Sequence, residues 1–130
     1  MDTDTISLKV PAKPEYILVI RITTSAVASR AGFGIDEIED IKVAVAEAGV
    51  TIMNQGNDVQ FLELKFGVSD NKEILINVSA SEVHEVKTSY LENEQTELSF
   101  YIMESPMDHV EKRIEDGLLS GVTLYKKFGG

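Results

Sequence analysis

The sequence predicts an α+β fold, a two-layer α/β sandwich in which helices pack on one face of a mixed β-sheet. Two long stretches in the first half of the chain place apolar residues at the three- and four-residue steps of a helix. Shorter stretches in the second half alternate between apolar and polar residues, as half-buried strands do. The chain has 130 residues and contains neither an internal repeat nor a Pro/Ser-rich linker, so we expect a single domain over residues 1–130.

The N-terminal quarter predicts a strand followed by a helix. Apolar and polar side chains alternate over Thr5–Val10, which is typical of a half-buried strand. Two prolines end this pattern, and the second, Pro14, suits the first turn of a helix. We expect that helix to run to about Arg30, because Gly32 and Gly34 follow.

The second helix has the clearest pattern in the sequence. Asp36 and Glu39 fit a capping box with Asp in place of Ser or Thr, and we expect the helix to run from Asp36 to about Asn54. Its apolar face consists of Ile38, Ile41, Val45, Ala48 and Ile52. The opposite face, which the spacing predicts to be solvated, consists of Asp40, Ala44, Glu47 and Thr51.

The second half predicts four strands and one short helix. Strands Val59–Val68 and Glu73–Ser79 are joined by a polar turn over residues 69–72, and Ser81–Thr96 reads as a loop. A helix from Glu97 to about Ser105 stops before Pro106. Its inward residues are predicted to be Leu98, Tyr101 and Ile102. Two closing strands, His109–Ile114 and Val122–Phe128, complete the order β-α-α-β-β-α-β-β.

Composition excludes several classes of function. Asp and Glu number 22 against 12 Lys and Arg, and the resulting net charge of -10 argues against nucleic-acid binding. Such an acidic surface suits a partner with basic patches, or serves solubility alone. The acidic start and the lack of a long apolar run or any cysteine predict a cytoplasmic protein that is not attached to a membrane. We expect no metal site, because His84 and His109 fall in different predicted elements.

Several separated blocks, in the same order, carry a resemblance to one family. The blocks are Val10–Tyr16, Ile20–Ile22, Asp36–Ala48, Phe100–Glu104, Met107–Asp108 and Ser120–Thr123. They resemble the anti-sigma-factor serine kinases of Gram-positive stress and sporulation switches, and the resemblance extends from about Ile6 to Phe128. It implies the histidine-kinase-like ATPase fold and a homodimer that holds a sigma factor. It also implies phosphorylation of a serine on a small antagonist protein, with ATP and Mg²⁺ as cofactors.

The resemblance implies a nucleotide site made of three motifs, and the first is altered here. Family members have a Glu that orients the attacking group and, one turn later, an Asn that ligates Mg²⁺. This chain keeps Glu47, but position 51 is Thr, which lacks the carbonyl oxygen that Mg²⁺ favours. Asn54, further along the same face, could replace the missing ligand or simply end the helix together with Gln55-Gly56-Asn57.

The other two motifs are altered as well. The Asp that reads adenine and the Gly two residues later correspond to Ala80 and Glu82, so specific base recognition is expected to be lost. The Gly-rich turn that cradles phosphates corresponds to Thr96, Glu97 and Ser99. At about 4 Å and an effective dielectric near 20, a Glu97 carboxylate beside a phosphate charge costs on the order of 4 kcal/mol. The lid segment 81–96 also looks shortened.

These departures predict a degenerate serine-kinase homologue, a pseudokinase with no cofactor and with Glu47 as a relic. The function expected is regulatory binding of a sigma factor or an anti-sigma antagonist. Arg21 aligns with an Arg that contacts partners in the family, although it could instead pair with Glu15 or Glu47. Two alternatives stay open: an active kinase that uses Glu47, Thr51 and Asn54, and a dimerisation module without a sigma partner.

Overall fold

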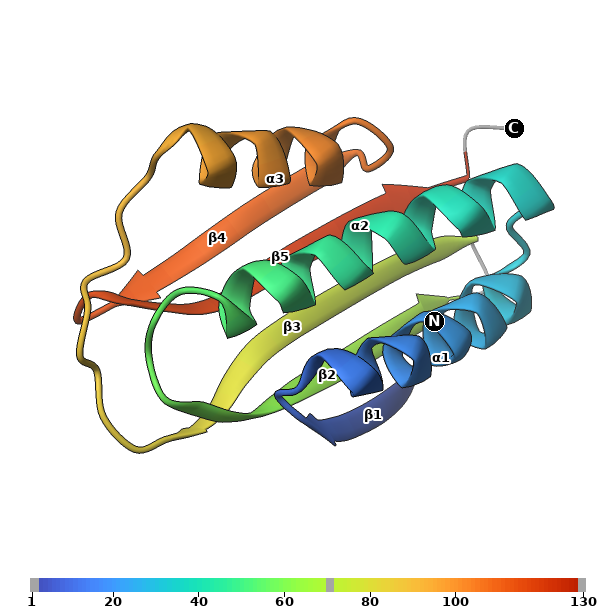
Figure 1. The fold of residues 1–130 in the computed structure, drawn as a ribbon. Coiled ribbons are helices and arrows are strands. Elements are labelled where there is room, and N and C mark those ends of the chain that lie inside the picture. The colour runs from blue at the N-terminus through green and yellow to red at the C-terminus, as the bar shows by residue number, and fades with distance from the viewer. Residues whose placement is uncertain (1–2, 70–71, 129–130) are drawn as a thin grey trace.

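Residues 3–69 and 72–128 are described by the computed structural model, and they form five strands and three α-helices in two layers (Figure 1). In chain order the elements are β1 (Thr3–Pro11), the short 3-10 helix η1 (Pro14–Tyr16), α1 (Ile17–Ala31), α2 (Ile35–Met53), β2 (Val59–Ser69), β3 (Glu73–Val83), α3 (Glu94–Glu104), β4 (His109–Glu115) and β5 (Leu118–Lys127). The strands form one sheet in the order β1-β2-β3-β5-β4, and the α-helices lie on one of its faces. The predicted α+β sandwich and element order are confirmed.

The prediction of a mixed sheet is wrong, because all of the neighbouring strand pairs in the described residues are antiparallel. Between β1 and β2 the chain runs out along α1 and back along α2, so β2 starts at the end where β1 stopped. Between β3 and β4 the chain crosses the sheet through a single helix, α3, so these two strands run in the same direction. If they were adjacent, they would form a parallel pair. The β4–β5 hairpin instead places β5 next to β3 and leaves β4 at the edge.

The core lies between the sheet and the helices. Every second side chain on β2 and β3 is buried against the helix layer, as the alternating pattern predicts. The opposite layer is the apolar face of α2, in which Ile41, Val45, Ala48 and Ile52 are fully buried. The strand side chains of this core include Leu62, Leu64, Phe66, Ile74, Ile76 and Val78.

Both ends of α1 and the start of α2 are set by local backbone contacts. Pro14 lies in η1, one turn before α1, and Gly32 ends α1 in a left-handed conformation at φ 100°. The predicted capping box of Asp36 and Glu39 is wrong. Gly34 is the N-cap of α2, and its N–H donates to Oε1 of Glu37 at 3.4 Å. Glu39 instead pairs with Nζ of Lys42 at 3.0 Å.

The largest differences from the prediction concern β3, α3 and β5, which begins at Leu118 and not at Val122. Strand β3 continues to Val83, and α3 begins at Glu94, so the irregular segment shrinks to residues 84–93. The residues of α3 that point into the core are Phe100 and Met103, whereas Leu98 and Tyr101 are 58% and 70% exposed. The predicted inward face is therefore wrong, because α3 packs through a different stripe. Within the part of the chain that the structure describes, no helix is both long and apolar enough to span a membrane.

Candidate functional site

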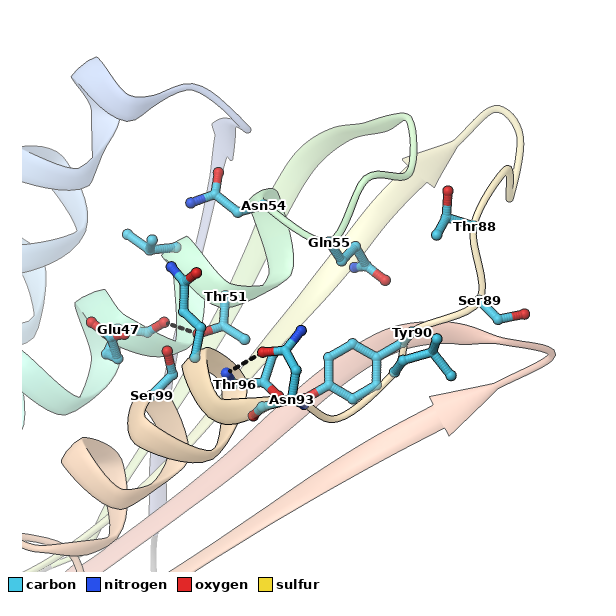
Figure 2. Close-up of a pocket in the computed structure, with 13 residues that line it drawn as sticks. Glu47, Thr51, Asn54, Gln55, Thr88, Ser89, Tyr90, Asn93, Thr96 and Ser99 are labelled. Atoms are coloured by element: carbon cyan, nitrogen blue, oxygen red, sulfur yellow. Dashed lines mark hydrogen bonds between the residues drawn. The ribbon is translucent and has the colours of Figure 1, made fainter.

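A cavity of about 340 Å³ opens between the C-terminal half of α2, the loop of residues 84–93 and the first turns of α3 (Figure 2). The loop contributes Thr88, Ser89 and Tyr90 to its wall. The two helices and the residue before α3 contribute polar side chains from sequence positions far apart: Glu47, Thr51, Asn54, Asn93, Thr96 and Ser99. The fold therefore brings Glu47 and Thr51 of the first motif close to Thr96 and Ser99 of the third motif.

The face of α2 that carries Glu47 is covered by α3. Ala44 is fully buried and Thr51 is 8% exposed, so the prediction of a solvated face is wrong for these two residues, whereas Asp40 is exposed as predicted. Glu47 itself is half-buried and lines the cavity. The Thr51 hydroxyl donates to the backbone carbonyl of Glu47 at 2.8 Å, so its proton is used inside the helix. Of the two side chains in the first motif, Glu47 and Thr51, only Glu47 offers a carboxylate oxygen.

The first turn of α3 is closed by a reciprocal cap. The side-chain Oδ1 of Asn93 accepts from the backbone N–H of Thr96 at 3.0 Å, and Thr96 Oγ1 accepts from the N–H of Asn93 at 2.8 Å (Figure 2). The first N–H groups of a helix have no partner inside the helix and can bind an anion, and the N–H of Thr96 is one of them. In this chain a side chain of the protein occupies it.

Glu97 lies outside the cavity. It lines a separate hollow on the other side of α3, together with Glu92, Phe100 and Lys112, where Lys112 pairs with Glu92. Its carboxylate does not line the cavity, because one helical residue beyond Thr96 the side chain points about 100° away.

Ala80 and Glu82 also lie outside the cavity wall. Ala80 pairs with Leu62 across β2 and β3 and packs against the core. Glu82 has a positive φ of 53°, which interrupts the alternation of β3. Its carboxylate pairs with Lys9, a residue of the sheet face opposite the helices, and this hydrogen bond raises the pKa of Lys9. The sequence pattern gave no sign of this left-handed residue within β3.

Two amide side chains fix the floor of the site, and the sequence analysis missed this role. Gln55 donates to the carbonyl of Leu119 at 3.0 Å and accepts from its N–H at 2.9 Å, which joins the end of α2 to β5. Asn57 is 9% exposed; it accepts from the N–H groups of Lys87 and Thr88 at 2.8 and 2.9 Å and donates to the Thr88 carbonyl at 2.9 Å. These partners are about thirty or more residues away, so no local pattern reveals them.

The electrostatics of the cavity follow from its lining. Among the described residues that line it, Glu47 is the one charged side chain, and the others are hydroxyl, amide or apolar groups. Such a wall offers hydrogen bonds to neutral polar groups and one carboxylate to a cation or an amine. It offers no lysine or arginine to a phosphate group.

Arg21 lies on a different surface, the outer face of α1. It is exposed, and its apolar neighbours on the same face, Leu18 and Ile22, are 62% and 60% exposed. Within residues 3–69 and 72–128 it forms no ion pair, so the alternative pairing with Glu15 or Glu47 is not observed. The two histidines do not line the cavity, and each has a single acidic neighbour, Asp58 for His84 and Glu111 for His109.

Comparison with known proteins gives the chain its relatives, although no family model matches it. It is 32% identical to the serine-protein kinase RsbW of Bacillus subtilis strain 168, over 95% of this chain and 87% of that protein. It is 33% identical to RsbW of Bacillus velezensis, over 94% and 86% of the two chains, and 31% identical to RsbW of Bacillus cereus strain AH820, over 92% and 84%. The chain therefore belongs to the RsbW family of anti-sigma-factor serine kinases.

Proposed function

We propose that this chain is a regulatory protein-binding domain that binds a sigma factor or an anti-sigma antagonist and does so without ATP. The carrying observation is the capped N-terminus of α3, where the Asn93 side chain occupies the Thr96 N–H that a phosphate would need. The role of a regulator follows the family, since the relatives are serine-protein kinases of the RsbW type.

The rest of the cavity supports the loss of nucleotide binding. Its described lining has no basic side chain to balance a polyphosphate, and Glu47 adds a negative charge. The Thr51 hydroxyl proton is committed to the backbone carbonyl of Glu47, and a hydroxyl is a weaker substitute for an amide oxygen toward Mg²⁺. Asn57 holds the loop of residues 84–93 in place with hydrogen bonds from the protein itself. The loop therefore needs no nucleotide to order it.

The surface we assign to the partner is the outer face of α1. Arg21 lies there beside the exposed Leu18 and Ile22, an arrangement of one arginine among apolar side chains that suits the centre of an interface. As in the family, we expect a homodimer. We propose that competition between partners, rather than a nucleotide, controls release.

The first test is calorimetric titration of the purified protein with Mg-ATP and Mg-ADP, with Bacillus subtilis RsbW as the positive control. We expect no heat of binding at millimolar nucleotide. Binding in the micromolar range would contradict the proposal.

The second test measures the affinity of the sigma factor and antagonist encoded in the same genome. Arg21→Ala is expected to weaken one of these complexes at least about tenfold, which is about 1.4 kcal/mol. Arg30→Ala is the matched control, since Arg30 is exposed on the same helix near Asp4 and away from Leu18 and Ile22. Equal effects of the two substitutions would remove the support for the α1 surface.

A second candidate, an active serine kinase, is favoured by one observation. Glu47 and Asn54 line the same cavity, so a carboxylate and an amide oxygen both face the space where a metal nucleotide would lie. Transfer of phosphate from ATP to the antagonist would support this candidate. Undiminished transfer by Glu47→Ala would argue against it.

A further inference from the structure

Charge is unevenly divided among the helices that cover the sheet. Helix α1 carries Arg21 and Arg30 and no acidic residue. Helices α2 and α3 together carry a single basic residue, Lys42, whose Nζ is bonded to Glu39 at 3.0 Å. Their acidic residues are Asp36, Glu37, Glu39, Asp40 and Glu47 on α2 and Glu94, Glu97 and Glu104 on α3. Most of the net charge of -10 is therefore concentrated on these two helices.

The same two helices enclose a surface groove. A hollow of about 350 Å³ lies between the N-terminal half of α2 and the C-terminal half of α3, which run in opposite directions (Figure 1). Its wall consists of Asp40 and Val43 from α2, Tyr101 and Ile102 from α3, and the two residues that follow α3, Ser105 and Pro106. Val43 is 45% exposed and Tyr101 is 70% exposed, so the groove presents apolar groups to solvent.

Helix α3 has a second apolar stripe that the fold does not bury. Leu98, Tyr101 and Ile102 recur at the three- and four-residue steps of one helix face, which is why the sequence predicts them to be inward. In the structure the core takes Phe100 and Met103 instead, and Leu98 and Tyr101 stay largely exposed. A periodic apolar face left in solvent beside a groove is typical of an interaction surface.

Carboxylates lie beside this groove on α2. By helical spacing Asp36 and Asp40 lie along the same face of α2 as Val43. Glu97 and Glu104 are one turn from Tyr101 on α3, but they line a separate hollow that also contains Lys112. In the parts of the chain that the structure describes, neither Asp36 nor Asp40 has a lysine, arginine or histidine within ion-pair distance, so both are free to meet positive charge from outside the molecule.

We propose that the α2–α3 groove, lined by Asp40, Val43, Tyr101 and Ile102, binds a basic amphipathic helix of a partner protein. An apolar residue of that helix enters the hollow beside Val43 and Ile102, and its lysines or arginines face the surrounding carboxylates. The same acidic rim repels nucleic acid and anionic lipid. The surface differs in place and in charge from the α1 surface, and it does not depend on the proposed loss of ATP binding.

The test uses a fluorescein-labelled peptide of about 18 residues, with leucines at helical steps on one face and lysines on the other. A second peptide replaces every lysine with glutamate and keeps the leucines. We expect the lysine peptide to bind at low salt with a Kd in the micromolar range, more weakly as salt rises, and the glutamate peptide not to bind. Backbone amide shifts in the NMR spectrum should cluster on the first half of α2 and the second half of α3.

Two paired variants locate the binding. Asp40→Lys with Tyr101→Ala should weaken the lysine peptide at least about tenfold. Glu85→Lys with Val86→Ala makes the same change of charge and removes a smaller exposed apolar side chain in the loop before α3, and it should change the Kd by less than twofold. Circular dichroism checks that both variants fold.

Three results would overturn the proposal: equal weakening by both paired variants, equal binding of both peptides, or amide shifts centred elsewhere. A fourth would change the occupant. If sedimentation shows self-association that Asp40→Lys with Tyr101→Ala abolishes, the groove binds a second copy of this chain, and the heterologous partner is wrong.

Discussion

Asn57 shows how one side chain can hold a whole loop. Its side-chain oxygen accepts hydrogen bonds from the backbone N–H groups of Lys87 and Thr88, and its side-chain nitrogen donates to the Thr88 carbonyl. All three donor–acceptor distances are 2.9 Å or less. Replacing it with alanine leaves these backbone groups without partners in a site that is largely closed to water. We expect Asn57→Ala to lower the free energy of unfolding by about 2–3 kcal/mol and to speed hydrogen exchange over residues 84–93.

The control for this prediction is Asn54→Ala. Asn54 lies on the same turn but is exposed, and among the described residues its side chain makes no hydrogen bond to protein. Urea unfolding should give a change within about 0.5 kcal/mol for this variant. If the two substitutions cost the same, the hydrogen bonds of Asn57 do not hold the loop.

Tyr125 and Glu73 give a prediction for alkaline pH. The Tyr125 hydroxyl donates to the Glu73 carboxylate, which raises the pKa of Tyr125 above 10.0 because the phenolate would lose that bond and face a negative charge. A raised pKa means that the stabilisation is present below about pH 10 and is lost as the pH rises through the folded value. We expect Glu73→Gln to lower this pKa, measured by tyrosinate absorbance at alkaline pH. Glu63→Gln, a change of the same charge on the same sheet, should leave it unaltered.

At the scale of elements, helix α2 and the β2–β3 hairpin could be predicted from sequence because their patterns are long and agree with their burial. The face of α2 that carries Ala44 and Thr51 could not, since α3 covers it and that contact lies about fifty residues away. The site was predicted in part for the same reason. Glu47, Thr51, Thr96 and Ser99 line one cavity, whereas Glu82 lies outside it, in a left-handed conformation that the sequence pattern does not predict.

The sequence pattern of α3 is compatible with two different buried faces. Its apolar residues spread around the helix, so one stripe holds Phe100 and Met103 and another holds Leu98 and Tyr101. Only the approach of β4 and α2 decides which stripe is buried. The start of α3 could have been predicted from the sequence, because Asn93 and Thr96 have the three-residue spacing of an N-cap pair.

The edge hairpin of the sheet depends on one glycine. A Cβ at Gly121 would overlap the guanidinium of Arg113 and lie 3.0 Å from the carbonyl of Val78. Arg113 could not then keep its bonds to Ser79 and to Thr123. We expect Gly121→Ala to cost about 1–3 kcal/mol in urea unfolding.

Gly67→Ala is the matched change for that prediction. Gly67 lies in β2, and a Cβ there would have its nearest neighbour at 3.7 Å, an ordinary contact. Because alanine suits a strand better than glycine, this variant should be neutral or more stable by a few tenths of a kcal/mol. Equal losses from the two variants would mean that the close approach of Arg113 is not the cause.

For the molecule as a whole, the crowding of carboxylates on α2 and α3 should reduce stability. Asp40 lies one helical turn from Asp36, and Glu104 lines a hollow with two other carboxylates, Glu92 and Glu97, and one lysine, Lys112. Within the described residues neither Asp40 nor Glu104 has an ion-pair partner. Salt at about 0.3 M screens such repulsion over distances beyond several ångströms. We therefore expect the Tm to rise by a few degrees between about 20 mM and about 300 mM NaCl.

Neutral substitutions separate this repulsion from a general effect of salt. Asp40→Asn with Glu104→Gln should raise the Tm at low salt and reduce the further gain on adding NaCl. Glu82→Gln removes a carboxylate that is paired with Lys9, so it should not raise the Tm. If the first variant is more stable alone yet binds the lysine peptide less well, the carboxylates are kept at a cost in stability, as residues of a binding surface often are. A variant that gains neither stability nor altered binding would show that these charges are merely solvated.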